Sequence, residues 1–211
     1  KAGKLKSVAI EYPGTAMICY ELTNGGKSGL MKNANIRKAI SYSINREEMV
    51  DSVYGRYTPA YGLVSPAINF KEKTYRSQAE EPISAEYKEY AGNKKKLQEL
   101  FQKGLNELGV KTPISDITLV FLTSGSTVPN QTEREYIKQS LEQNLGIKIE
   151  LNTVGDSSLF VSERDALHYD IMISAWYSDY NDPLDYLDIF RSNVYGKTNY
   201  CFGYEFCPRY M

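Results

Sequence analysis

The part of the sequence that most restricts the fold is residues 117–152, where two apolar stretches flank an amphipathic one. Residues 117–123 and 147–152 are rich in Ile, Leu and Val, as buried strands are. After a loop predicted at 124–130, apolar side chains recur at helical spacing, namely Ile137, Leu141 and Leu145. A strand, a helix and a strand in so short a stretch favour a right-handed crossover with parallel pairing. The sequence therefore predicts an α/β architecture.

Other elements are predicted before and after this unit in the sequence. Residues 7–22 are predicted as extended structure with a bend at Pro13, and 71–89 as a polar surface excursion. Asn45 precedes Glu48 by the spacing of a capping box, which predicts the start of a helix. Helices are expected from about 35, at 46–54, 93–108 and 157–166 and after Pro183, and a further strand at 169–176.

Composition and charge argue against several classes of protein. Hydrophobic residues make up 42% of the 211 residues, enough for a real core. The 25 Lys and Arg against 26 Asp and Glu provide no basic field to gather phosphates, so we expect no nucleic-acid binding. No stretch has the ~20 consecutive apolar residues of a membrane span, and residues 1–5 lack the apolar region of a signal peptide. We expect a soluble globule, which is compatible with earlier removal of an export signal.

Catalytic and metal-binding constellations are sparse. Three cysteines without a Cys-x-x-Cys pair and a single histidine, His168, argue against a metal site, and we expect neither metal nor cofactor. Ser124 and Ser126 lie in no Gly-x-Ser-x-Gly motif, which makes a serine hydrolase a poor alternative. We therefore expect that the chain is not an enzyme.

The most informative functional feature is Ser-Ala-Trp-Tyr-Ser-Asp-Tyr-Asn-Asp-Pro at residues 174–183. It places Asp179 just past a predicted buried strand, where ligands of open α/β sheets gather. The aromatic residues beside this carboxylate are Trp176, Tyr177 and Tyr180. An acidic group among flat apolar rings predicts a site for a cationic, partly apolar ligand.

Two of these residues also have structural interpretations. Asp179 can cap a turn, as Asp often does beside Asn and Pro. Trp176 can pack in the core while its indole finds a polar partner. The nearby carboxylates of Asp182, Asp185 and Asp188 are interpreted as favourable charge at the start of a helix and not as calcium ligands.

Several segments resemble a known family, in the same order along the chain. Residues 35–50 read Asn-Ile-Arg-Lys-Ala-Ile-Ser-Tyr-Ser-Ile-Asn-Arg-Glu-Glu-Met-Val. They resemble the signature helix pair of the extracytoplasmic solute-binding proteins of family 5, the peptide-binding components of bacterial ABC importers. The segments 58–66, 144–151 and 169–183 are also similar to that family, and the resemblance runs from about Val8 to Asn199.

The resemblance implies a periplasmic-binding-protein-like lobe with a mixed sheet and helices on both faces. Residues 1–200 would be the carboxy-terminal lobe of a two-lobed protein, and 201–211 are a tail that we cannot assign. In the family's oligopeptide binders, the acidic residue of the Trp-x-x-Asp-Tyr-Asn motif pairs with the α-amino group of the peptide. The resemblance places this role on Asp179, within the matching motif that ends at Tyr180 and Asn181, and places backbone contacts with the peptide at Ala175 and Tyr177.

The chain departs from the family at Ile173, where some members carry an arginine that meets the carboxylate of short peptides. Arg164 is then the remaining candidate for that contact, although a surface ion pair with Glu163 or Asp165 is the simpler interpretation. The implied partners are a peptide and the membrane subunits of an ABC importer, in an extracytoplasmic location, with any lipid anchor outside this stretch. Another solute, such as a dipeptide, an oligosaccharide or a metal chelate, is the main alternative.

Overall fold

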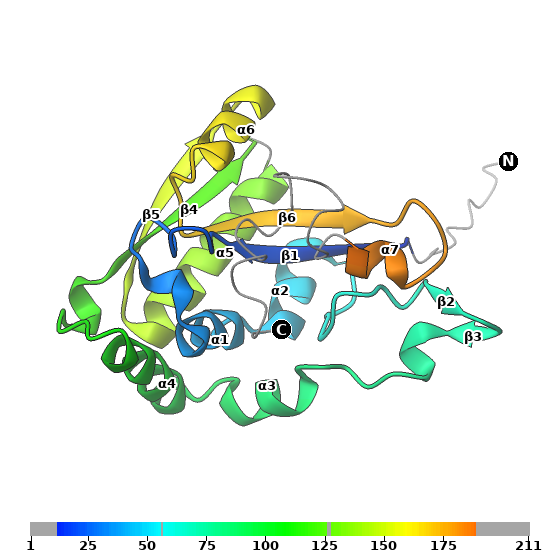
Figure 1. Ribbon diagram of the computed structural model, residues 1–211, viewed down its shortest axis with the longest axis horizontal. Coiled ribbons are helices and arrows are strands. Elements are labelled where there is room, and N and C mark those ends of the chain that lie inside the picture. The colour runs from blue at the N-terminus through cyan, green and yellow to red at the C-terminus, as the bar shows by residue number, and fades with distance from the viewer. Residues whose placement is uncertain (1–11, 56, 126–127, 189–211) are drawn as a thin grey trace, which may run out of the picture.

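The computed structural model describes residues 12–55, 57–125 and 128–188, and its centre is a four-stranded mixed sheet (Figure 1). The strands are β1 (Gly14–Tyr20), β4 (Thr118–Ser124), β5 (Lys148–Val154) and β6 (Ile171–Tyr177). Their order is β1-β6-β4-β5, with β1 antiparallel to β6 and β4 parallel to both β5 and β6. The predicted α/β class with a mixed sheet is confirmed.

The predicted strand-helix-strand unit is present as β4, α5 (Val128–Leu145) and β5. The two strands pair in parallel from Thr118 opposite Lys148 to Ser124 opposite Val154. The helix begins at Val128, inside the stretch that the sequence predicted as a loop. Proline is tolerated in a first helical turn, where an N–H would have no intrahelical acceptor, so Pro129 does not delay the helix.

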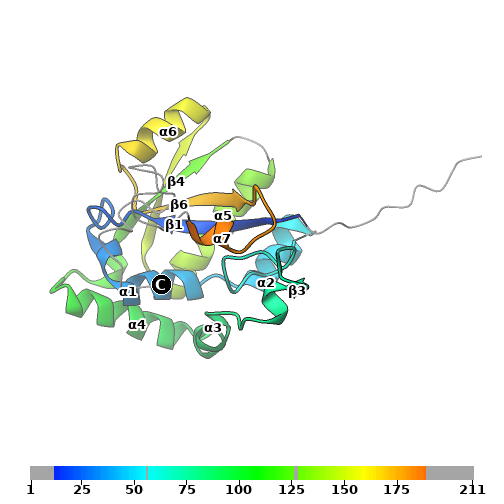
Figure 2. The same cartoon turned by 45° about the vertical axis from the view of Figure 1, so that its right-hand side comes forward.

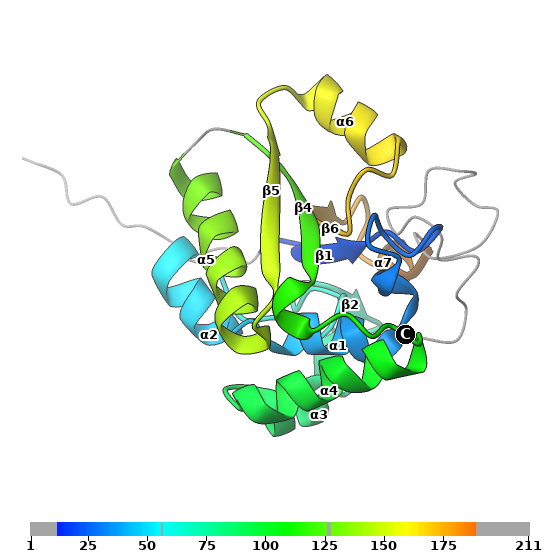
Figure 3. The ribbon, with the colours of Figure 1, turned by 90° about the vertical axis from the view of Figure 1, so that its left-hand side faces the viewer.

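The larger apolar core lies between the sheet and three helices, α1 (Ala34–Tyr42), α4 (Lys94–Glu107) and α5. Its fully buried members include Ile36, Ile40, Leu97, Phe101, Leu119, Phe121 and Leu141. On the other face α6 (Ser157–Asp165) packs against β4 and β5, and its Phe160 contacts a smaller apolar cluster. Figure 3 shows α5 and α6 on opposite sides of these strands, so the predicted helices on both faces are confirmed.

The helix predicted at 46–54 is divided into two parts. Asn45 accepts a hydrogen bond from the N–H of Glu48 at 3.1 Å and begins α2 (Arg46–Met49), as the capping motif predicted. The remainder, Val50–Tyr54, is a π-helix that ends at Gly55, whose φ of 61° is left-handed. The period of the apolar residues does not distinguish these two helix types.

The polar stretch at 71–89 lies at the surface, as predicted, and it also contains secondary structure that the sequence did not indicate. A hairpin of β2 (Asn69–Phe70) and β3 (Lys73–Thr74) lies at its start, followed by a 3-10 turn at Tyr75–Ser77 and by α3 (Ser84–Tyr90). Another 3-10 turn, at Ile114–Asp116, precedes β4. The helix α3 has only one buried side chain, that of Tyr87. So polar a segment carries too little apolar periodicity to be recognised as a helix.

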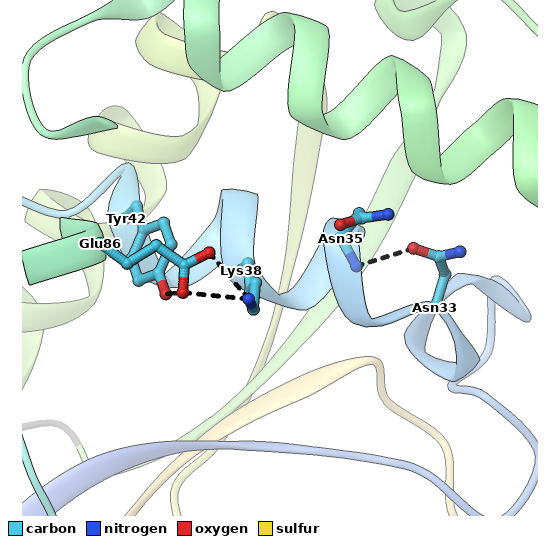
Figure 4. A network of polar contacts seen from close by, with 5 residues as sticks. All are labelled: Asn33, Asn35, Lys38, Tyr42 and Glu86. Carbon is cyan, nitrogen blue, oxygen red and sulfur yellow. Dashed lines mark hydrogen bonds and ion pairs between the residues drawn. The ribbon is translucent and has the colours of Figure 1, made fainter. Parts of the chain in front are cut away.

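Polar contacts fix both ends of α1 (Figure 4). Asn33 begins the helix, because its side-chain oxygen accepts from the N–H of Asn35 at 2.8 Å. Near the other end, the Lys38 Nζ and the Tyr42 hydroxyl donate to Glu86 of α3, at 2.7 and 2.9 Å. The contacts with Glu86 therefore join α1 to α3.

The carboxyl end of β6 leads to α7 (Leu184–Leu187) at the same end of the sheet as the β2–β3 hairpin (Figure 2). A third apolar cluster of Val64, Ile68 and Tyr186 lies here. The predicted bend at Pro13 precedes β1, whereas the extended structure predicted before residue 12 and the tail 201–211 lie outside the described residues. Among the described helices, none combines the length and apolarity needed to cross a bilayer.

Candidate functional site

The site starts from an open edge of β6. The parallel pairing of β4 with β6 consists of Phe121 opposite Ile171 and Leu122 opposite Met172. Beyond Met172, no described strand pairs with this side of β6, although β1 continues along the other side as far as Tyr177. Among the described residues, the carboxyl half of β6 is therefore paired with a strand on one edge only, and its other edge is called the open edge below.

The phase of the β1–β6 pairing decides which backbone groups face that open edge. In an antiparallel pair, every second residue directs its N–H and C=O to the partner strand. The N–H of Ser178 donates to the carbonyl of Pro13 at 2.8 Å, and the register places Trp176 in the same phase. Ala175 and Tyr177 therefore direct their N–H and C=O away from β1, toward the open edge.

Asp179 lies just beyond this edge with its side chain exposed. Its backbone N–H donates to Asp185 Oδ2 at 3.1 Å, while its carboxylate forms no hydrogen bond or ion pair with any described residue. The turn-capping role falls to Asp182 instead, whose Oδ1 accepts from the N–H of Leu184 at 2.8 Å. The carboxylate of Asp179 is thus accessible to a ligand.

Trp176 packs in the protein, as its structural interpretation predicted, and is also partly exposed. Its side chain packs against the cluster of Val64, Ile68 and Tyr186 and is half-buried. Its Nε1 donates to Asp185 Oδ2 at 3.0 Å, so the indole has the expected polar partner inside the protein. Trp176 is therefore held by the fold and stays only partly exposed.

The other residues of the motif differ in their exposure and contacts. The side chains of Tyr177 and Tyr180 are 56% and 51% exposed. Tyr177 meets Tyr12 edge to face, with ring centroids 5.5 Å apart, and lies where a Cβ on Gly14 would stand. Asn181 is used by the fold, because its Oδ1 accepts from the N–H of Asn69 at 2.7 Å. The rings of Tyr177 and Tyr180 therefore supply exposed aromatic surface close to Asp179 in the sequence.

Arg164 lies apart from this group. It belongs to α6, ahead of the first residue of β6, whereas Asp179 follows the last one, and the two ends lie far apart in Figure 1. Its guanidinium pairs with Asp165 at 2.8 Å, which is the surface ion pair that the sequence suggested. Ile173 is half-buried and packs against the larger core.

The residues considered for hydrolysis are not brought together. Ser124 ends β4, and His168 precedes β6, so the parallel pairing of these strands places them at opposite ends. The ring of His168 is exposed and lies 3.4 Å from a Glu163 oxygen. Ser126 lies outside the described residues.

Sequence reasoning missed Asp185. It was interpreted as helix-start charge, yet its side chain is only 3% exposed and its Oδ2 accepts from both Trp176 and Asp179. The one sequence signal for this burial is its place between Leu184 and Tyr186, two apolar neighbours.

Comparison with known sequences gives a consistent set of relatives. The sequence profile described as bacterial extracellular solute-binding proteins, family 5 Middle, matches residues 1–198. The oligopeptide-binding protein OppA of Bacillus subtilis is 26% identical over 170 residues, which cover 80% of this chain and 29% of OppA. The dipeptide-binding protein DppE of the same organism is 28% identical over 177 residues, covering 80% of this chain and 30% of DppE.

Solved structures agree with these relatives. OppA of Listeria monocytogenes bound to peptide matches with a TM-score of 0.73 at 28% identity, over 88% of this chain and 35% of that one. The pheromone receptor PrgZ, whose structure describes its mode of peptide binding, matches with a TM-score of 0.69 at 25% identity, over 87% of this chain and 34% of that one. The chain therefore spans about a third of the length of these four relatives.

Proposed function

The chain belongs to the bacterial extracellular solute-binding proteins of family 5, and we propose that within this family it captures extended peptides for an ABC importer. Residues 1–200 would form the carboxy-terminal lobe, with one wall of the ligand cleft. Its partners would be a peptide and the membrane subunits of the importer, with any lipid anchor outside this stretch. The names of the relatives, which are binding proteins and not enzymes, support a role without chemistry.

The observation that carries this proposal is the open edge of β6. An extended peptide can add to such an edge as a further strand, and its main chain then supplies the hydrogen bonds. Ala175 and Tyr177 have the backbone groups in the required direction, by the register of β1 and β6. Since these bonds do not depend on the peptide's side chains, binding would tolerate many sequences.

Asp179 supplies the charge that would fix one end of the peptide. Its carboxylate is exposed and unpaired among the described residues, next to the last residues of the open edge. A hydrogen bond between charged groups contributes ~1.5 to 3 kcal/mol, and more water is excluded once a second lobe covers the site. We therefore assign Asp179 to the peptide's α-ammonium group.

The neighbouring rings would meet the apolar part of the ligand. Tyr177 and Tyr180, which flank Asp179 in the sequence, are more than half exposed, and Trp176 is partly exposed. Asn181 would act indirectly, by holding the loop to the hairpin through Asn69. Arg164 is the weakest member of the proposed set, because it pairs with Asp165 and lies at the other end of β6.

The test uses the full-length protein that contains this chain. Peptides with a free amino terminus should raise its melting temperature, and the same peptides with an acetylated amino terminus should not. Replacing Asp179 by Asn should reduce affinity for the free-amine peptide at least tenfold, a loss of ~1.4 kcal/mol or more. Equal stabilisation by free and acetylated peptides would remove Asp179 from this role.

Peptide length is a separate question in the same titration. Because relatives named for oligopeptide and for dipeptide binding both match, the screen should include peptides of two to eight or so residues. Binding of longer peptides supports strand addition along β6, whereas binding of dipeptides alone would favour the alternative ligand class.

A further inference from the structure

The carboxylate of Asp185 joins three parts of the site. Its Oδ2 accepts from the indole Nε1 of Trp176 at 3.0 Å and from the backbone N–H of Asp179 at 3.1 Å. These donors belong to the end of β6 and to the loop after it, whereas Asp185 belongs to α7. One oxygen atom therefore holds the aromatic and the acidic residue of the proposed ligand site in a fixed relation.

Burying this carboxylate costs free energy, because the charged group loses its contact with water. Asp185 is 3% exposed, and within the described residues no Lys, Arg or His forms an ion pair with it. The apolar cluster of Val64, Ile68 and Tyr186 lies around the indole that it bonds. Buried charges are normally paired, because their desolvation is otherwise compensated only by hydrogen bonds. A neutral acceptor could hold the two N–H groups at a lower cost.

Resting on the proposed function, we infer that Asp185 is a positioning residue for the ammonium group of the peptide. It fixes the main chain at Asp179 and the ring of Trp176, and it adds a second carboxylate within hydrogen-bonding distance of the Asp179 backbone. The weak screening around a buried carboxylate lets its charge act over a longer distance than that of a solvated one. Both effects favour a cationic end group over a neutral one.

The experiment compares the full-length wild-type protein with Asp179→Asn and three further variants by calorimetry, using one peptide that is either free or acetylated at its amino terminus. Asp185→Asn keeps an acceptor and loses the charge, and Asp185→Ala loses both. Asp182→Asn is the matched control, since it removes a charge from the same loop while an Asn can still accept from Leu184. Melting temperatures without ligand report any general loss of stability.

We expect Asp185→Asn to weaken binding of the free-amine peptide about threefold to tenfold, and Asp185→Ala more than tenfold, as is typical when a buried acceptor is lost. The much weaker binding of the acetylated peptide, followed at higher peptide concentration, should change by less than about twofold in each, as should both affinities in the control. A purely structural role would instead reduce the affinity for both peptides by the same factor, whatever the change in melting temperature.

The outcomes separate this inference from the proposed function. If the wild-type protein does not distinguish free from acetylated peptide, the assignment of Asp179 fails. If the wild type distinguishes them and Asp179→Asn abolishes the difference, but Asp185→Asn leaves it unchanged, only the role of Asp185 is overturned.

Discussion

The Nζ of Lys138 donates to the carbonyl oxygen of Ile149 at 2.8 Å, joining α5 to the outer edge of β5. One turn later, Glu142 accepts from the N–H of Ile149 at 3.1 Å and pairs with Lys138 at 2.6 Å. Because β5 is the last strand of the sheet, its outward backbone groups would otherwise be available to another strand. The ion pair therefore closes this edge at Ile149, while the edge of β6 stays open.

Replacing Glu142 by Ala should lower the free energy of unfolding by about 1 kcal/mol, because the N–H of Ile149 loses its acceptor. Glu142→Gln, which keeps an acceptor, should lose less than half as much. Urea denaturation measures both, and equal losses in the two variants would show that the bond to Ile149 contributes nothing.

The ion pair at Glu86 predicts a small dependence of stability on acid. Burial alone would raise the pKa of Glu86. The hydrogen bonds from Lys38 and Tyr42 and the charge of Lys38 together lower it by more, so the net pKa lies below the usual 4.5. A lowered pKa in the folded state gives stability that is present above the unfolded pKa and lost as pH falls through the folded one. Glu86→Gln should therefore be less stable than the wild type at pH 7 and converge with it in acid.

Solvent limits the size of this effect. The Lys38 and Glu86 side chains are 45% and 39% exposed, so we expect a difference of about 0.5 kcal/mol or less at neutral pH. Thermal melts from pH 7 to about pH 3 measure it. A constant difference across that range would contradict the assignment.

Asp170 should not tolerate replacement by its nearest neutral analogue. It is fully buried, its Oδ1 accepts from the N–H and hydroxyl of Ser28, and its Oδ2 accepts from the N–H of Val120. In Asp170→Asn an amide N–H₂ must face one of these donors, which should cost about 2 to 3 kcal/mol in denaturation experiments. Asp156→Asn, at the start of α6, is the control and should be nearly neutral, because Asn caps helices as well as Asp. Similar losses in both would contradict the proposed reason.

Proline at residue 175 tests strand addition directly. The N–H of Ala175 points away from β1, so Ala175→Pro removes a donor that pairs with no strand in the described part of the chain. We expect peptide affinity to fall at least tenfold with a small change in melting temperature, whereas Ala175→Val keeps the N–H and should bind nearly as the wild type does. Retained affinity in the proline variant would place the peptide elsewhere.

The sequence predicted those parts of the fold that depend on local pattern. The apolar spacing of Ile137, Leu141 and Leu145 located α5, and the Asn45 motif located the start of α2, because both signals lie within a few neighbouring residues. The exposure of Asp179 agrees with the role expected from its place after a strand. Its pairing with a peptide stays a prediction.

Features that depend on distant contacts could not be predicted in the same way. The open edge of β6 exists because β4 pairs with it only as far as Met172. No sequence pattern in either strand predicts the residue at which β4 and β6 stop pairing. The burial of Asp185 depends on Trp176, nine residues earlier, reaching it across the loop. The helix α3 is held by the buried Tyr87, by Tyr90 against the larger core and by the bond between Glu86 and Tyr42 of α1, contacts that all depend on residues distant in the sequence.

The outward backbone groups of Ala175 and Tyr177 have a consequence for how such a lobe can evolve. Every amino acid except proline carries the same N–H and C=O, so mutation can alter the side chains here without deleting the groups that would meet a peptide. Recognition by the main chain is therefore largely immune to sequence drift. Under the proposed mode, relatives that are 26% and 28% identical could bind peptides through the same main-chain groups while their side chains differ.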